Sequence, residues 1–235
     1  MFKTYIIHVS DALEREIYIK KQIGNKEFDS IFIVDGDKKD LTPQIISNYF
    51  IEPLNNVSNV SSCAYKHILA YEKIVNDSID YALILEDDIS FYKNFKPQFE
   101  LLCNEIKAKK IHNCLISLED SNLQYVKKSE KINNSYLYKK PNGRMAGAYI
   151  IDNECAKNIL LEIKNNKCSQ PIDWFHNQCA NKDLISIYWC HPAIAIQGSL
   201  NGAMPSMIDD KKFGYTRIVL FSIQKAYKKM LYNFL

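Results

Sequence analysis

Short apolar runs alternate with amphipathic segments along the first third of the chain. Residues 4–9 are β-branched and aromatic, which predicts a buried strand. Residues 11–23 place Leu13, Ile17 and Ile23 at helical spacing, which predicts a helix. Residues 31–34 are apolar again and are closed by an Asp-Gly turn signal. This strand–helix–strand order favours parallel pairing and an α/β sheet.

The rest of the chain continues this alternation of helical and strand-like segments. The strongest helix signal lies within residues 61–77, where Ser61 or Ser62 is a candidate cap and apolar residues recur on one face. Other predicted helices are 42–49, 96–108, 153–166 and 171–182, and predicted strands are 81–85, 114–120, 144–152 and 186–197. No internal repeat is visible, so we expect one α/β domain.

The C-terminal residues 211–235 differ in character because they carry six basic residues and no acid. Their apolar residues form the pattern of a basic amphipathic helix. Such a helix fits an enzyme that lies on the anionic inner face of the cytoplasmic membrane. The alternative is a helix that packs its apolar side on the domain. We therefore expect a domain over residues 1–210 and a membrane-associating segment over residues 211–235.

Composition narrows the class of protein further. The 235 residues are 47% apolar and 24% charged, as in an ordinary globular protein, and the net charge of +3 is too small to indicate nucleic-acid binding. The seven cysteines are odd in number and show no CxxC spacing, which favours a reducing compartment. The N-terminus lacks the pattern of a secretory signal, and no stretch approaches the ~20 apolar residues of a membrane span. These features predict a cytoplasmic protein.

Three consecutive carboxylates follow the predicted strand that begins at Tyr81. These are Glu86, Asp87 and Asp88, and they stand where a buried strand ends. Ligands gather at the carboxyl ends of strands in α/β proteins, and paired carboxylates are hard oxygen ligands for Mg²⁺ or Mn²⁺. Such a metal would neutralise a diphosphate. The alternative is a solvated acidic turn.

Several segments together resemble glycosyltransferase family 25, the lipooligosaccharide-type sugar transferases. A Cys-Ala-x-x-His helix precedes a Leu-Glu-Asp-Asp strand end within residues 61–91. The other matching segments, in order, are YIIHVSDALERE, IFIVDGDKKDLT, GRMAGAYIIDNECAKNIL, PIDWF and HPAIAIQGS. The resemblance covers roughly residues 3–200. The sequence departs from the family pattern at Ser62, at Tyr65-Lys66 and at Ala148, which affects acceptor or packing details more than the reaction class.

The resemblance implies a GT-A-like, Rossmann-like fold with a mixed central sheet flanked by helices. It also implies Mn²⁺ or Mg²⁺ as cofactor, a UDP-sugar as donor and a lipid-linked oligosaccharide as acceptor, with β-1,4-galactosyltransferases as the nearest type. Glu86 and Asp88 would hold the metal, and Asp87 would meet ribose or sugar hydroxyls. His191, late in the chain, is a further candidate metal ligand.

The resemblance also implies transfer with inversion, which needs a general base for the acceptor hydroxyl. Asp173 is the first candidate, because a helix start beside Trp174 can raise the pKa of a carboxyl group. Glu119 and Asp120, at the end of another predicted strand, are the rival candidates. Trp174 is also a candidate sugar-stacking residue, although aromatic side chains more often pack in the core.

Further candidates for substrate or nucleotide binding follow from the same resemblance. They are Arg15, Asp35, His67, Gly147 and Gln197. Arg15 would meet the pyrophosphate or uracil side, and Gly147 would let the backbone approach the sugar. Each has an ordinary alternative, such as a solvated helix charge for Arg15 or a core hydrogen bond for His67.

Two other functions compete with sugar transfer. The same acids would serve a nucleotidyltransferase or a metal-dependent phosphohydrolase. A non-catalytic protein that binds a membrane surface or nucleic acid through its basic tail is the third possibility, but the near-neutral body and the lack of a basic aromatic groove argue against nucleic acid. The resemblance implies a metal-dependent hexosyltransferase, with galactose as the expected sugar.

Overall fold

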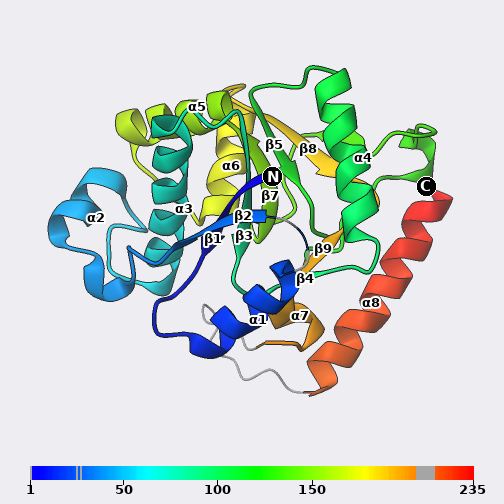
Figure 1. Cartoon of the computed structure of the whole chain (residues 1–235), viewed down its shortest axis with the longest axis horizontal. Coiled ribbons are helices and arrows are strands. Elements are labelled where there is room, and N and C mark those ends of the chain that lie inside the picture. Colours follow the sequence, from blue (N-terminus) through cyan, green and yellow to red (C-terminus); the bar gives the residue numbers. More distant parts are fainter. Residues whose placement is uncertain (1, 25, 27, 205–214) are drawn as a thin grey trace.

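The chain folds around one seven-stranded sheet with helices on both faces (Figure 1). The computed structural model describes residues 2–24, 26, 28–204 and 215–235, and for residues 215–217 it describes the backbone only. The boundary predicted at residue 210 and the basic residues Lys211 and Lys212 lie outside the described residues, as does the side chain of Arg217.

The sheet is mixed, with the strand order β2-β1-β3-β7-β5-β8-β6. Parallel pairing joins β1 to β2, β1 to β3 and β5 to β8, whereas β7 and β6 run antiparallel to their neighbours. A separate antiparallel pair joins β4 to β9. The strands are β1 (Phe2–Ile7), β2 (Phe28–Ile33), β3 (Tyr81–Glu86), β4 (Ile89–Phe91), β5 (Cys114–Ser117), β6 (Leu137–Lys140), β7 (Ala148–Asp152), β8 (Ser186–Cys190) and β9 (Ala195–Gln197). The predicted mixed α/β sheet flanked by helices is confirmed.

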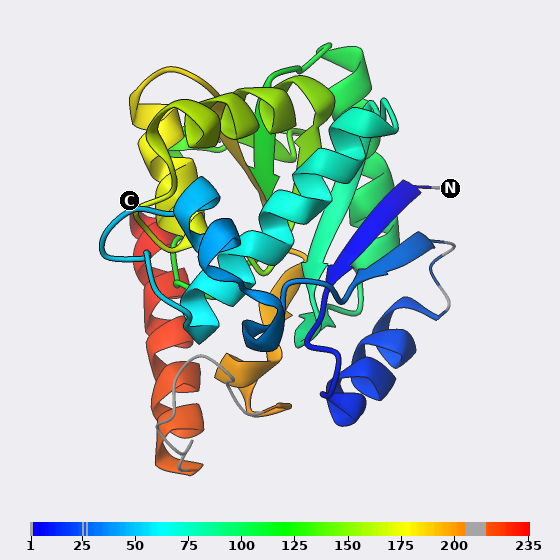
Figure 2. The same cartoon turned by 90° about the vertical axis from the view of Figure 1, so that its left-hand side faces the viewer.

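Helices cover the sheet from both sides and form a three-layer arrangement (Figure 2). One core lies under α2, α3, α5 and α6, and the other lies under α1 and α4. The helices are α1 (Leu13–Ile23), α2 (Pro43–Tyr49), α3 (Asn59–Asn76), α4 (Phe95–Ala108), α5 (Asn153–Asn166), α6 (Ile172–Asn181), α7 (Gly198–Asn201) and α8 (Tyr215–Phe234), with 3₁₀ turns at η1 (Lys38–Asp40) and η2 (Lys128–Glu130).

Side-chain alternation along β3 explains why its apolar run is continuous. Ala82 and Ile84 belong to one core, and Leu83 and Leu85 belong to the other. All four side chains are fully buried. A strand with helices on both faces needs apolar residues at every position, and burial of this kind stabilises the fold by about 1.5–3 kcal/mol for each large aliphatic side chain.

Two local predictions are corrected by the structure. Helix α3 begins earlier than expected, because Ser58 is the N-cap and Ser61 completes a capping box with it. In α1, Leu13 and Ile17 are exposed, whereas Ile19 and Ile23 are buried. The apolar spacing therefore located the α1 helix correctly, and it was right about Ile23 but wrong about Leu13 and Ile17.

Parallel pairing brings the ends of three strands to one edge of the sheet. Ile7 at the end of β1 is in register with Ile33 of β2 and with Glu86 of β3. Strand β3 ends at Glu86, and Asp87-Asp88 form a turn rather than a continuation of the strand. Pairing of Ile89 with Gln197 then places the β9 end beside this turn.

Helix α8 lies along one side of the domain, at the end of the chain (Figures 1 and 2). Lys225 pairs with the buried carboxylate of Asp120 at 3.0 Å, and the Tyr232 ring packs edge-on against Tyr125 with centroids 5.8 Å apart. In the described part of the chain, no helix combines the length and the apolar character that crossing a membrane requires.

Candidate active site

A cavity of about 490 Å³ opens where β1, β2 and β3 end. Its lining includes His8, Arg15, Asp37, Cys63, Lys66 and Glu86. The lining combines cationic and anionic side chains, and it lies at the carboxyl ends of parallel strands, where α/β proteins bind their ligands. Glu86, Asp87 and Arg15 were predicted from the sequence to share a site, and the structure brings them together here.

Asp87 is a buried anchor for two neighbouring side chains. Its Oδ2 lies 2.8 Å from Nδ1 of His8, and its Oδ1 accepts a hydrogen bond from the Arg15 guanidinium. The Val9 amide also donates to Oδ2, at 3.4 Å. These contacts fix the Arg15 guanidinium at the cavity wall. The predicted role of Asp87 in binding ribose or sugar hydroxyls stays a prediction, because its oxygens already serve Arg15 and His8.

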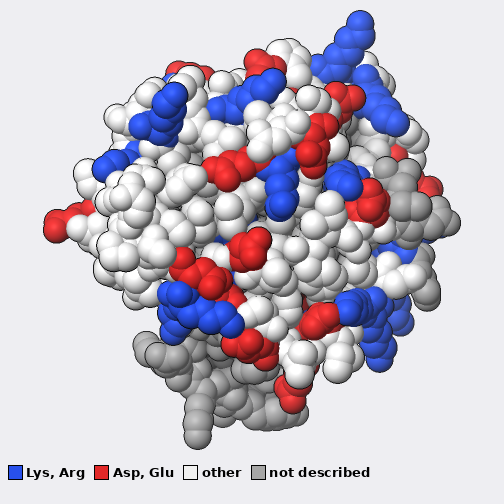
Figure 3. All heavy atoms as spheres, turned by 60° about the vertical axis from the view of Figure 1, so that its left-hand side comes forward, with Lys and Arg blue, Asp and Glu red and all other residues white. Residues whose placement is uncertain are grey.

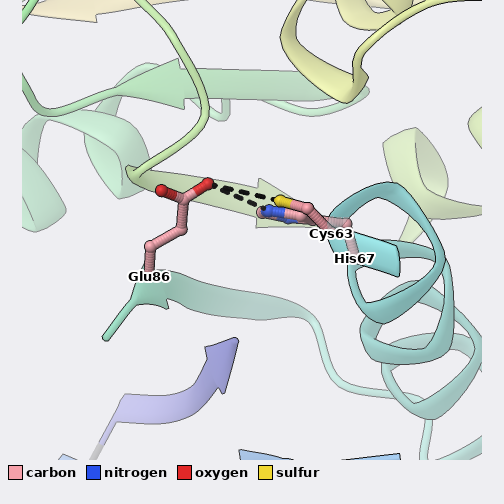
Figure 4. Close-up of side chains that lie close together, drawn as sticks. All are labelled: Cys63, His67 and Glu86. Carbon is pink, nitrogen blue, oxygen red and sulfur yellow. Dashed lines mark hydrogen bonds and ion pairs between the residues drawn. The ribbon is translucent and has the colours of Figure 1, made fainter. Parts of the chain in front are cut away.

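Glu86 joins groups that come from distant parts of the chain. Its Oε2 accepts a hydrogen bond from Gln197 Nε2 at 3.3 Å. Its Oε1 lies 3.7 Å from Cys63 Sγ and 3.6 Å from His67 Nε2. Figure 4 draws both contacts as dashed lines. Three predicted site residues, Glu86, His67 and Gln197, are therefore neighbours. Cys63 is a member of the site that the sequence analysis did not single out.

Asp88 is nearly inaccessible to solvent and only partly paired. Its Oδ2 accepts from the Ser199 amide at 3.3 Å and lies 3.7 Å from the Arg15 guanidinium. Its Oδ1 is buried and has no hydrogen-bond partner among the described residues. Burial first, and then repulsion by Glu86, raise the pKa of Asp88 to about 6, although Arg15 acts in the opposite direction.

These features fit a divalent cation held by Glu86 and Asp88. An unpartnered buried carboxylate oxygen and a raised pKa indicate a site where anionic charge is concentrated without full compensation. Carboxylate oxygens are the ligands that Mg²⁺ and Mn²⁺ prefer. When bound, such an ion would supply positive charge to stabilise a departing diphosphate.

A second ion pair, between Lys66 and Asp37, also lines the cavity. Lys66 is almost fully buried, lies 3.0 Å from Asp37 and donates to the Val34 carbonyl at 2.6 Å. Burial acts to raise the pKa of Asp37, but hydrogen bonds from Ser10 and Lys66 hold it below the usual value. Asp35, the predicted binding residue, is exposed, and Asp37 two residues later takes the inward position. In an extended chain two residues that are two positions apart face the same side, but Gly36 between them has a φ of +93°, so the turn there sends Asp35 and Asp37 in different directions.

Glu119 is fully buried, and both of its oxygens are occupied. Oε1 accepts hydrogen bonds from the amides of Gly147 at 2.7 Å and Ala148 at 3.2 Å, and Oε2 accepts from the Ser121 hydroxyl. Burial raises the pKa of Glu119 to about 8 against these hydrogen bonds. Glu119 thus joins the β5 end to the β7 start, which makes it less suited than an accessible acid to act as a base.

Gly147 is required by close packing within the protein. A Cβ at this position would lie 2.8 Å from Gln197 Nε2 and 2.9 Å from the Ile89 side chain. The space predicted for a substrate sugar is therefore filled by side chains of β4 and β9. Its carbonyl accepts a hydrogen bond from the Glu86 amide at 2.7 Å, so Gly147 supports the position of Glu86.

Asp120 and His191 lie in a different cavity, of about 350 Å³, between the sheet edge and α8. Asp120 accepts a hydrogen bond from Tyr92 Oη at 2.7 Å in addition to its ion pair with Lys225. Burial lowers the pKa of His191 to about 4, and its ring packs edge-on against Tyr138. The structure does not bring His191 together with Glu86, because these two residues line different cavities.

Asp173 lies in the first turn of α6, close enough to Glu86 for the two carboxylates to interact electrostatically. Burial raises the pKa of Asp173, a hydrogen bond from the Trp174 amide lowers it, and the charge of Glu86 raises it again. Asp173 also interacts electrostatically with Cys63 and His67. Trp174 is 64% exposed, so its ring is available to a ligand. Of the three predicted bases, Asp173 is the one that combines partial exposure with proximity to Glu86.

Residues 1–176 match the sequence model of glycosyltransferase family 25 (LPS biosynthesis protein). The match covers 176 of 235 residues, about three quarters of the chain. The chain belongs to glycosyltransferase family 25. This membership confirms the predicted family and makes the protein a glycosyltransferase, and the family description places it in lipopolysaccharide biosynthesis. The matched segment includes Arg15, His67, Glu86, Asp88 and Asp173.

Two solved structures resemble the fold at low sequence identity. UTP-bound UGPase from Acinetobacter baumannii has 10% identity and a TM-score of 0.48, with 98% of each chain covered. A197 from STIV has 11% identity and a TM-score of 0.42, with 80% of this chain and 81% of that chain covered. No curated protein matches the chain.

Proposed function

We propose that this family 25 enzyme transfers a hexose from a UDP-sugar to a sugar of a lipooligosaccharide or lipopolysaccharide acceptor. Galactose is the proposed hexose, and the reaction is metal-dependent and inverting. The observation that carries the proposal is a pair of carboxylates where β1, β2 and β3 end. Glu86 lines the cavity, and Asp88, two residues later and buried behind the lining, keeps one oxygen without a hydrogen-bond partner among the described residues. Arg15 on the same wall supplies positive charge toward a diphosphate.

Each side chain has a defined part in this proposal. Asp87 holds Arg15 in place, and Arg15 binds the diphosphate of the donor. Glu86 and Asp88 would hold Mn²⁺ or Mg²⁺, and such an ion would supply positive charge for the departing nucleoside diphosphate. Asp173 takes the proton of the acceptor hydroxyl, which then attacks the anomeric carbon from the face opposite the leaving group. Trp174 offers an exposed ring on which a sugar can stack.

Donor binding is tested by thermal unfolding with Mn²⁺ and a panel of nucleotides and nucleotide sugars. We expect a Mn²⁺-dependent rise in Tm with UDP and with UDP-galactose. A ligand at 100 times its Kd adds about 2.7 kcal/mol to the free energy of unfolding, because it binds only the folded state. A rise with ATP or UTP alone would instead support a nucleotidyltransferase. No rise with any nucleotide would contradict the proposal.

We further propose that α8 attaches the enzyme to the inner face of the cytoplasmic membrane. Its outward face carries an exposed stripe of Leu220, Ile223, Tyr227, Met230 and Phe234, with spacings of three and four residues. Such spacing places them on one helix face, and Lys228 is exposed as well. Lys225 and Lys229 instead turn toward Asp120, so the charge predicted for lipid contact partly anchors the helix to the domain.

Replacing Ile223 and Met230 together with Asp should reduce binding to anionic vesicles more than about tenfold, because it removes two apolar contacts and adds repulsion. Vesicle co-sedimentation measures this, and replacement of the exposed polar pair Ser222 and Gln224 with Asp is the charge-matched control. Equal losses in both variants would show that charge alone matters. Dimerisation through the stripe without vesicle binding would contradict the membrane proposal.

Nucleic acid is not among the proposed partners. Acidic and basic side chains are interspersed over the face that Figure 3 shows. A polyanion needs a stripe or patch of uniformly positive charge, and the net charge of the chain is only +3.

A further inference from the structure

Three potential metal ligands of different chemistry meet at the edge of the cavity. Cys63 and His67 stand four residues apart on one face of α3, and Glu86 ends β3. One ligand atom from each lies within 4.8 Å of the other two (Figure 4). A carboxylate pair such as Glu86 and Asp88 suits Mg²⁺ or Mn²⁺, but a thiol with an imidazole suits a softer ion.

The imidazole of His67 is fully buried, and hydrogen bonding at Nδ1 fixes its orientation. Its Nδ1 lies 2.8 Å from Tyr149 Oη, which lies 2.6 Å from Tyr71 Oη, which in turn lies 2.7 Å from His176 Nε2. The other ring nitrogen, Nε2, is buried, has no hydrogen-bond partner among the described residues and points toward Glu86 and Cys63. Nε2 therefore faces the space between the three residues, where a bound ion would give it a partner.

The hydrogen bonds that link His67, Tyr149, Tyr71 and His176 can all be formed with the protons donated in either of two directions. If Tyr71 donates to His176, then Tyr149 donates to Tyr71 and accepts from Nδ1 of His67. Nε2 then presents a lone pair, as a metal requires. The reverse order leaves a proton on Nε2, directed at Glu86. A metal ion therefore selects one of two tautomers without breaking a hydrogen bond, which is the orienting role that outer partners of histidine ligands have.

We propose that Cys63, His67 and Glu86 form a binding site for a thiophilic divalent metal, and that Zn²⁺ is the preferred ion. In a tetrahedral zinc site the ligand atoms are about 3.3–3.6 Å apart, from bond lengths of about 2.0–2.3 Å. The observed 3.7 Å from sulfur to Glu86 and 3.6 Å from nitrogen to Glu86 are within a few tenths of an ångström of this. Thiolate and carboxylate together neutralise the ion, and the thiol proton leaves to solvent on binding.

Because Glu86 belongs to both ligand sets, Zn²⁺ at this site competes with the proposed Mn²⁺ or Mg²⁺ for that carboxylate. Zinc should therefore inhibit sugar transfer. The metal site itself rests only on the three side chains, whereas the inhibition rests also on the proposed function. Metal binding is accordingly measured without nucleotide, so that a failure of one inference is distinguishable from a failure of the other.

The test is the optical spectrum of the purified full chain with Co²⁺ in place of Zn²⁺. We expect a thiolate-to-cobalt charge-transfer absorption that Zn²⁺ displaces. Cys63→Ser should lose this absorption and weaken Zn²⁺ binding in a chelator competition by more than about tenfold, since even loss of an outer partner costs about 10–100-fold. Tyr149→Phe should keep the absorption but weaken binding. Cys103→Ser is the matched control, because Cys103 is also a half-buried free thiol.

A second measurement needs no variant. Zn²⁺ should protect Cys63, but not Cys103, from alkylation by iodoacetamide, as read by mass spectrometry. The proposal is overturned if Co²⁺ gives no thiolate absorption, if Cys63→Ser retains it, or if Zn²⁺ protects both thiols equally or neither.

Discussion

Replacing Asp88 with Asn is expected to abolish Mn²⁺-dependent donor binding and sugar transfer, and to stabilise the ligand-free protein. Asp88 is buried beside Glu86 and has one oxygen without a partner among the described residues. An amide removes the buried negative charge that the cation needs. It also removes repulsion that the ligand-free fold must overcome. Gain of stability with loss of function is typical of residues that are placed for a ligand rather than for the fold.

The stabilisation should depend on pH. The pKa of Asp88 is about 6 in the folded protein and about 3.8 when unperturbed. Between these values the folded chain retains a proton that the unfolded chain has lost, so the Asp88 contribution to stability falls as pH rises through this window. The slope is at most about 1.4 kcal/mol per pH unit for one proton. Thermal melts between pH 4 and 8 should show a smaller decline for Asp88→Asn than for the wild type.

Asp80→Asn is the matched control for this experiment, because Asp80 is exposed near the opposite end of β3. It should leave Tm, its pH dependence and the response to UDP with Mn²⁺ unchanged. A Mn²⁺-dependent response to UDP that survives in Asp88→Asn would contradict the metal assignment.

Replacing Asp173 with Asn is expected to reduce the rate of transfer by about 10²–10⁴-fold, the usual contribution of a general base. Donor affinity should stay the same, because the base acts on the acceptor. Burial raises the pKa of Asp173, and only its ionised form can accept a proton. The wild-type rate should therefore rise with pH through that pKa, and the variant should lose this dependence. Steady-state release of UDP in the presence of acceptor, recorded over a range of pH, measures the rate and its pH dependence.

Glu119→Gln provides the contrast to this result. A carboxamide can still accept hydrogen bonds from the Gly147 and Ala148 amides and can donate to Ser121, so the local structure should persist. We expect this variant to retain most of the activity. If Glu119→Gln loses transfer while Asp173→Asn keeps it, the base is Glu119 and not Asp173.

The strands were predictable because burial on both faces leaves a direct signal in the sequence. The continuous apolar run before Glu86 predicted β3, and the strand–helix–strand order predicted the parallel pairing of β1 and β2. The α1 face was not predictable, because Leu13 and Ile17 have the same spacing as a buried pair. Which face of a short helix is buried depends on the element against which it packs, and the spacing does not state this.

The candidate site shows the same division. The sequence alone determined the residue types, namely carboxylates at the end of a core strand and a Cys-Ala-x-x-His helix before it. Register between β1 and β3 decided that Asp87 would anchor Arg15 and His8, and the packing of the chain decided that His191 and Glu86 would line different cavities. The local pattern of apolar and polar residues indicates which positions are buried, because the polarity of each side chain is set by the residue itself. Which charged groups come into contact depends on how segments tens of residues apart pack together, and only the tertiary structure decides this.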